Sequence, residues 1–183
     1  MEGPTMNNRI AVSLGVSSLL LASLAGLAVA QEKRASPHET VTAIVNDKKI
    51  TITYGRPYKK GRVIFGGLEP WGKVWRTGAD EATTLTTEAD LMIGSLHVIA
   101  GTYSLFTIPN EKEWTLVLNK TAKQWGAFKY DQGMDYGRAP MKVTRPSAPI
   151  EQMTIAVEKK GSDTAVLKVM WDETIASIDV MVH

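Results

Sequence analysis

An alternation of apolar and polar residues, running from residue 40 to the C-terminus, limits how this chain can fold more than any other feature of its sequence. Residues 50–54 read Ile-Thr-Ile-Thr-Tyr, so every second side chain there is apolar. A repeat of two residues places such side chains on one face of a β-strand. Comparable strand-like runs occupy residues 40–45, 83–87, 91–93, 96–99, 103–108, 114–119, 125–130, 153–158, 165–171 and 175–182.

Residues that favour tight turns separate these runs. Gly94-Ser95 and Pro109-Asn110 are examples, because such residues adopt or preset turn conformations. We find no amphipathic helical pattern, no internal repeat and no linker after residue 40. The sequence therefore predicts an all-β fold, with one domain over residues 40–183 that is an antiparallel β-sandwich or a related barrel.

The N-terminal segment differs from the rest of the chain. Arg9 precedes an apolar stretch, residues 10–27, and residues 28–30 read Ala-Val-Ala. This order is typical of a secretory signal peptide with its cleavage site. We predict a signal peptide over residues 1–30, an exposed lead-in over residues 31–39 and a secreted or periplasmic location. The alternative is a retained membrane anchor, because the apolar stretch approaches the length that spans a bilayer; after cleavage no membrane span remains.

Composition excludes several classes of function. The chain has no cysteine, which excludes disulfides, thiolate nucleophiles and cysteine-based metal sites. A formal net charge of +2 is too weak a bias to predict a nucleic-acid partner. His38, His97 and His183 do not have the spacing of a metal site. We therefore predict neither a metal site nor a cofactor.

Two segments interrupt the strand pattern, residues 55–80 and residues 131–149. Loops of this length are uncommon in compact domains unless they carry function or are disordered. The first segment contains three aromatic residues after residue 62, namely Phe65, Trp71 and Trp75. Such a composition argues against disorder, and we expect a functional site to include this segment.

Five stretches of the chain resemble a bacterial family labelled DUF2911. They are residues 56–57, 61–62, 70–83, 100–109 and 125–131, and the run Trp75-Arg76-Thr77-Gly78-Ala79 within them is the most distinctive. The resemblance covers nearly all of the mature chain and implies a secreted domain of unknown function, with no activity attached. The chain has Asp80 where the family often has Asn, and Trp71 where Tyr is common. Relatives with Asn at position 80 have no carboxylate there.

The first candidate site is a cationic and aromatic loop. Convergent arginines can bind a carboxylate, phosphate or sulfate through paired hydrogen bonds, and exposed tryptophans can stack on a sugar or another ring. The alternative is a solvated loop with tryptophans packed in the core. The candidate ligand-binding residues are Arg56, Arg62, Trp71, Trp75 and Arg76.

The second candidate site consists of carboxylates. Asp80 and Glu81, with Asp131 and Asp135, are candidates for the paired acids that glycoside hydrolysis requires. Ion pairs with Arg76 or Arg138 are the alternative explanation for these acids.

Three hypotheses for the function follow, in decreasing order of support. The first is non-enzymatic binding of a small anionic or sugar-like ligand, or of a cell-envelope partner. The second is a carboxylate-dependent hydrolase or lyase that acts on cell-envelope carbohydrate, and the third is a purely structural module. Whether the protein is an enzyme stays open at this point.

Overall fold

The computed structural model describes residues 1–3 and 35–183, so the predicted signal peptide lies outside the described residues apart from its first three. Within that part of the chain there is one short 3₁₀-helix, η1 (Gln132–Met134), and no helix long and apolar enough to cross a membrane. The strands are β1 (His38–Val45), β2 (Lys48–Gly55), β3 (Thr84–Thr87), β4 (Leu91–Ile93), β5 (Leu96–Val98), β6 (Gly101–Ile108), β7 (Glu113–Asn119), β8 (Asp135–Thr144), β9 (Ile150–Lys159), β10 (Thr164–Asp172) and β11 (Thr174–Val182).

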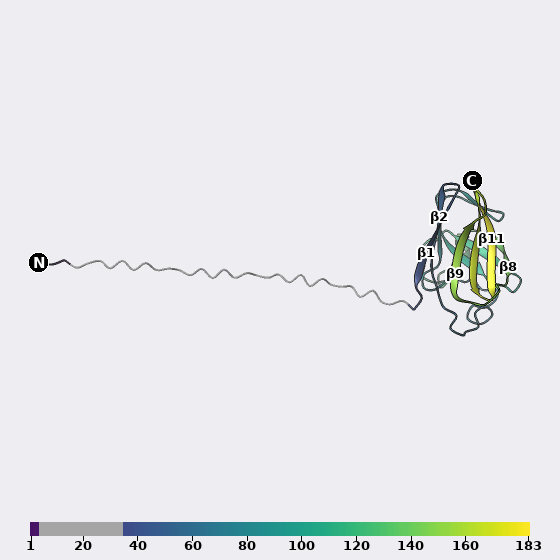
Figure 1. Ribbon diagram of the computed structural model, residues 1–183, viewed down its shortest axis with the longest axis horizontal. Coiled ribbons are helices and arrows are strands. Elements are labelled where there is room, and N and C mark those ends of the chain that lie inside the picture. Colours follow the sequence, from purple (N-terminus) through teal and green to yellow (C-terminus); the bar gives the residue numbers. More distant parts are fainter. Residues whose placement is uncertain (4–34) are drawn as a thin grey trace. The chain divides into compact units, whose positions relative to one another are not determined.

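All of these strands belong to one antiparallel sheet. Its order is β1-β2-β3-β6-β7-β8-β11-β10-β9, and the short strands β4 and β5 extend it from β11. The two ends of this order, β1 and β9, contact each other, so the sheet curls into a nearly closed barrel (Figure 1). The predicted all-β class is confirmed, and the barrel is the one of the two expected architectures that forms.

The first hairpin shows how the sequence produces this sheet. Asn46 and Asp47 join β1 to β2 with φ angles of 49° and 56°, the left-handed conformation that a two-residue hairpin turn requires and that Asn and Asp tolerate. In β2 the apolar side chains of Ile50, Ile52 and Tyr54 are buried. The apolar side chains of the predicted alternation therefore face the barrel interior.

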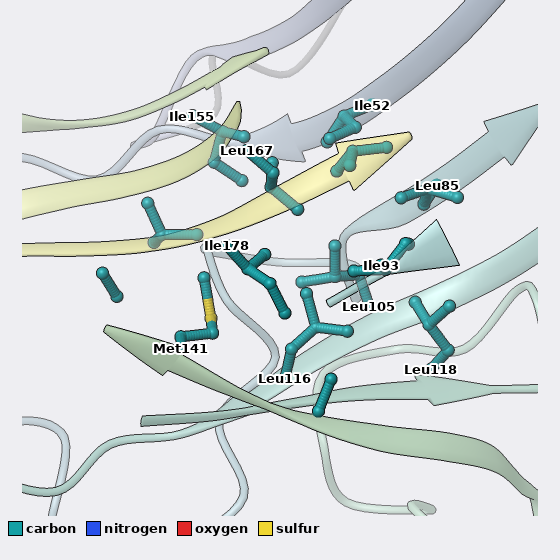
Figure 2. Close-up of a cluster of buried hydrophobic side chains, with 14 of the residues drawn as sticks. Ile52, Leu85, Ile93, Leu105, Leu116, Leu118, Met141, Ile155, Leu167 and Ile178 are labelled. Carbon is teal, nitrogen blue, oxygen red and sulfur yellow. The ribbon is translucent and has the colours of Figure 1, made fainter. Parts of the chain in front are cut away.

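The core fills the inside of the barrel. Ile52 of β2, Leu116 of β7 and Ile178 of β11 are among the buried side chains that converge there (Figure 2). Full burial of such a side chain contributes about 1.5–3 kcal/mol. Since the chain has no disulfide, this burial is the main source of its stability.

A cluster of aromatic rings orders the first of the two long segments. Phe65 lies edge-on to Trp114, with ring centroids 4.7 Å apart, and packs in the same way on Trp75 and Trp171. Trp75 also stacks on Trp171 with centroids 6.0 Å apart. These contacts anchor residues 65–75 to strands β7 and β10, so this segment is an ordered part of the barrel.

The structure corrects two predicted segments. Residues 125–130 form a turn rather than a strand, because Gly126 has a φ of 62° and Trp125 pairs only through an isolated bridge with Glu81. Residues 135–144, predicted as part of a loop, form β8. Its Pro140 lies opposite Thr115 of β7, while β11 pairs only with residues 142–144. A proline has no amide to donate, so it fits where one side of the strand is not paired.

Gly55, the last residue of β2, provides a test of how closely the chain packs next to this strand. A Cβ at Gly55 would lie 2.3 Å from the carbonyl oxygen of Ala79, and backbone cannot yield as a side chain can. We expect Gly55→Ala to lower the free energy of unfolding by about 1–3 kcal/mol, as overpacking does. Urea denaturation measures this change.

Gly101→Ala is the matched control for this experiment. Gly101 is also a strand glycine, but a Cβ there would lie 3.4 Å from its nearest neighbour, an ordinary contact. Its effect should stay within about 1 kcal/mol. Equal effects of the two substitutions would contradict the close approach of β2 and Ala79.

Candidate functional site

The centre of the candidate site is a tight turn, residues 76–82, called the Asp80 turn below. It begins after Trp75, which pairs with Thr107 of β6 through two backbone hydrogen bonds of 2.8 and 3.0 Å. Thr77 and Asp80 have φ angles of 55° and 62°, which few residues other than glycine, Asn and Asp adopt readily. The buried Thr77 hydroxyl lies 3.0 Å from the Thr107 hydroxyl, which holds the strained backbone in place.

Backbone hydrogen bonds tie the Asp80 turn to two other parts of the chain. The Ala79 amide donates to the Gly55 carbonyl at 3.3 Å, which connects the turn to the end of β2. The Ala82 amide donates to the Gln124 carbonyl and the Gly126 amide donates to the Asp80 carbonyl, both at 3.0 Å. The turn therefore fixes the position of Trp125, because its two neighbours in the sequence, Gln124 and Gly126, both bond to the turn.

His38 joins this arrangement from the first position of β1. Its Nε2 lies 3.1 Å from Oδ2 of Asp80 and 3.4 Å from Oε2 of Glu81. Each of the three side chains offers one ligand atom, and these atoms all lie within 4.8 Å of one another. We call this group the His38–Asp80–Glu81 cluster; a metal ion is one partner that such a donor set can hold.

Sequence reasoning missed His38 because it assigned this residue to the lead-in. The residue lies 42 positions before Asp80, and no local pattern connects the two. They meet because β1 pairs with β2 so that His38 lies opposite Gly55, and Gly55 in turn contacts the Asp80 turn. The proximity of His38 and Asp80 therefore follows from the register of the first hairpin.

A cavity of about 440 Å³, called the His38 cavity, opens beside the cluster. Its lining combines apolar surface with groups that form hydrogen bonds. Trp125 has the largest aromatic surface there, and 59% of this residue is exposed. The polar residues of the lining include His38, Glu81, Lys123 and Gln124.

A second cavity, of about 450 Å³, lies beside Arg76 and is called the Arg76 cavity. Asp80 lines it as well, and its carboxylate lies 3.1 Å from His38, a lining residue of the first cavity. Arg62 and Glu69 also line this cavity, and the Arg76 Nε donates to the Gly78 carbonyl at 3.1 Å. Burial raises the pKa of Glu69 to about 7, although the positive charges of Arg76 and Arg62 oppose the rise.

The structure places Arg56 at the seam of the barrel. It forms an ion pair with Glu39 of β1, and its Nε and Nη2 donate to the Met153 carbonyl and the Thr154 hydroxyl of β9 at 3.0 and 2.8 Å. These bonds connect the two ends of the sheet. Arg62 donates to the carbonyls of Lys59 and Tyr58 and so holds its own turn while it stays exposed.

The two predicted binding tryptophans do not form a shared platform. Trp75 is 3% exposed and belongs to the core. Trp71 is 38% exposed, stacks on Phe65 with ring centroids 6.1 Å apart, and lines a third cavity together with Arg62. The exposed tryptophan beside the His38–Asp80–Glu81 cluster is Trp125, which the sequence analysis placed in a strand.

The remaining predicted carboxylates have structural partners. Asp131 caps η1 by accepting a hydrogen bond from the Gly133 amide at 2.8 Å. Asp135 accepts hydrogen bonds from Tyr130 and Asn119 and forms an ion pair of 2.7 Å with Arg138. Of the four predicted acids, the structure brings Asp80 and Glu81 together at the cluster, and local partners account for the other two.

The fold and the site define an antiparallel β-barrel domain with a mixed polar and aromatic cavity next to a group of one histidine and two carboxylates. Residues 36–180 match the family described as Protein of unknown function (DUF2911), and the chain belongs to this family. This match confirms the resemblance seen in the sequence. Comparisons with curated proteins and with solved structures find no match.

The raised pKa of Glu69 predicts a dependence of stability on pH. Between pH 4.5, the ordinary pKa, and about 7, the unfolded chain releases the Glu69 proton while the folded protein keeps it. The free energy of unfolding therefore falls as pH rises through this window, by up to about 3 kcal/mol. The loss is complete above the folded-state value.

The Glu69→Gln variant should lack this particular loss. Relative to the wild type, its free energy of unfolding should rise from about pH 4 to about pH 8. Urea denaturation of both proteins across this range measures the difference. Parallel pH profiles of the two proteins would show that Glu69 ionises in the folded state as it does in the unfolded chain.

Proposed function

We propose that this protein is an exported binding domain that holds a sugar-like ligand in the His38 cavity. The observation that carries the proposal is the exposed ring of Trp125 at the wall of a cavity that hydrogen-bonding side chains also line. The volume, about 440 Å³, lies within the range of small-ligand sites, roughly 300–1,000 Å³.

The chemistry of the lining matches that of a sugar. A sugar ring has an apolar face, which an aromatic ring can cover, and an edge of hydroxyl groups. Lys123 supplies donors for these hydroxyls, and the Glu81 carboxylate supplies acceptors. A ligand of this kind would use both the aromatic and the polar parts of the cavity.

The charges near the His38 cavity favour a neutral sugar over an anion. Lys123 is a cation in the lining, but the carboxylates of Asp80 and Glu81 beside the cavity outnumber it and oppose the approach of a negative charge. Two cations of residues 55–80 have structural partners elsewhere: Arg56 pairs with Glu39, and Lys59 pairs with Asp172. The anion-binding alternative therefore has less support from the geometry than the sugar-like one.

Export is part of the proposal and rests on the sequence of residues 1–30. A signal peptide that ends at residue 30 would leave the first residue of β1 only a few positions from the new N-terminus. The proposed ligand is then a carbohydrate of the cell envelope or of the surroundings of the cell.

A carboxylate-dependent hydrolase is the second candidate function. Glu69 and Asp80 line the same Arg76 cavity, and glycoside hydrolysis requires one protonated and one ionised carboxyl group. The raised pKa of Glu69 suits the protonated role. Turnover of a bound saccharide by the wild type, lost in Glu69→Gln and Asp80→Asn, would assign the protein to this class.

Substitution of Trp125 tests the binding proposal. We expect the protein to bind at least one neutral mono- or disaccharide of a panel, measured by calorimetry. Trp125→Ala should weaken this binding by about tenfold or more, because loss of an aromatic contact worth about 1.4 kcal/mol changes the dissociation constant tenfold.

Trp71→Ala is the matched control, since Trp71 is also an exposed tryptophan but lines a different cavity. It should bind the saccharide as the wild type does, and denaturation midpoints show whether both variants are folded. If Trp71→Ala loses binding while Trp125→Ala keeps it, the His38 cavity is not the site. If the folded protein binds no saccharide, the proposal is wrong.

A further inference from the structure

The spacing of the atoms in the His38–Asp80–Glu81 cluster resembles that around a coordinated metal ion. Zinc holds nitrogen and oxygen ligands at about 2.0–2.2 Å, so two ligands of a tetrahedral ion lie about 3.4 Å apart. His38 Nε2 lies 3.1 and 3.4 Å from the nearest carboxylate oxygens of Asp80 and Glu81. All three ligand atoms lie within 4.8 Å of one another, so one ion can reach all of them once the side chains adjust.

The backbone that carries these ligands is fixed from several directions. His38 pairs with Gly55 in the first hairpin, and the Ala79 amide donates to that same Gly55. The Asp80 carbonyl accepts a hydrogen bond from Gly126. An ion that binds here would therefore lose little free energy to the ordering of its ligands.

We propose that the His38–Asp80–Glu81 cluster is a binding site for a divalent transition-metal cation, with Zn²⁺ as the probe. One imidazole and two carboxylates form a mixed nitrogen and oxygen donor set, which suits zinc and its neighbours. Calcium prefers six to eight oxygen ligands and fits this set less well.

Three protein ligands leave at least one coordination position for another molecule. Because His38 and Glu81 line the His38 cavity, a hydroxyl group of a ligand in that cavity can take this position. This last step rests on the proposed sugar-binding function. Binding of the ion itself does not, and it is tested with the metal alone.

The experiment is a calorimetric titration of Zn²⁺ into the purified, chelator-stripped protein without a polyhistidine tag. We expect one ion for each chain in the wild type. His38→Ala and Asp80→Asn should weaken binding by at least about tenfold, since even the loss of outer-shell partners costs that much. His38 is exposed, and Asn tolerates the positive φ of residue 80, so both variants should fold.

His97→Ala is the matched control. His97 Nε2 lies 3.5 Å from an Asp90 oxygen, and its ring centroid lies 6.1 Å from that of His183. This is a second place on the chain where histidine and carboxylate meet. If zinc bound only adventitiously to surface histidines, this place would bind it too, and His97→Ala would then weaken the binding. The His97→Ala variant should bind the ion as tightly as the wild type.

Three results would overturn the metal site: no saturable binding by the wild type, equal affinity of the wild type and His38→Ala, or loss of binding in His97→Ala. Denaturation midpoints measured in chelator confirm that each variant is folded. The saccharide titration, repeated in chelator, separates the two proposals. Saccharide binding without zinc binding would overturn the metal site alone, and zinc binding without saccharide binding would overturn the sugar proposal alone.

Discussion

The hydrogen bonds of residues 75–83 connect the parts of the barrel that build the candidate site. Trp75 and Thr83 bond to β6 through Thr107 and Leu105, and the Asp80 turn between them bonds to the end of β2 and to residues 124–126. Without these bonds, two residues with positive φ would relax to more common conformations. The carboxylates of the cluster would then lose their place beside β1 and the tryptophan of the cavity.

The closure of the barrel supports the same site from the other direction. β1 lies at one end of the sheet order, and among the strands of residues 35–183 it pairs with β2 alone. Its contact with β9 and the bonds that Arg56 makes to both strands hold it in position. Because His38 is the first residue of β1, these bonds also fix the histidine of the cluster. Arg56, which was predicted to bind a ligand, thus contributes to the site by closing the barrel.

The sequence predicts the strands well where one face is buried and the other is exposed. Residues 50–54 alternate because β2 has one face toward the core, and this alternation is readable without a structure. Residues 125–130 are also rich in apolar side chains, but Gly126 adopts a positive φ and its amide bonds to the Asp80 turn, so the segment forms a turn. The glycine and proline residues of β8 led to the prediction of a loop, although β8 pairs with β7 over most of its length.

The candidate site was predictable only in part. Asp80 and Glu81 are neighbours in the sequence, so their proximity needs no tertiary information. His38 and Trp125 reach them through the register of a hairpin and through two backbone bonds, and neither leaves a local signal. Asp135 could be matched with Arg138 from their spacing of three residues, and this ion pair forms.

Amide hydrogen exchange, read residue by residue, tests most directly whether the site is formed by the backbone before any ligand binds. In the ligand-free protein, the amides of Ala79, Ala82 and Gly126 should exchange nearly as slowly as those of a core strand residue such as Leu116. Slow exchange would show that their hydrogen bonds open only with much of the barrel. Exchange as fast as that of an unprotected loop would contradict the account, because the Asp80 turn would then not hold the cluster and Trp125 together.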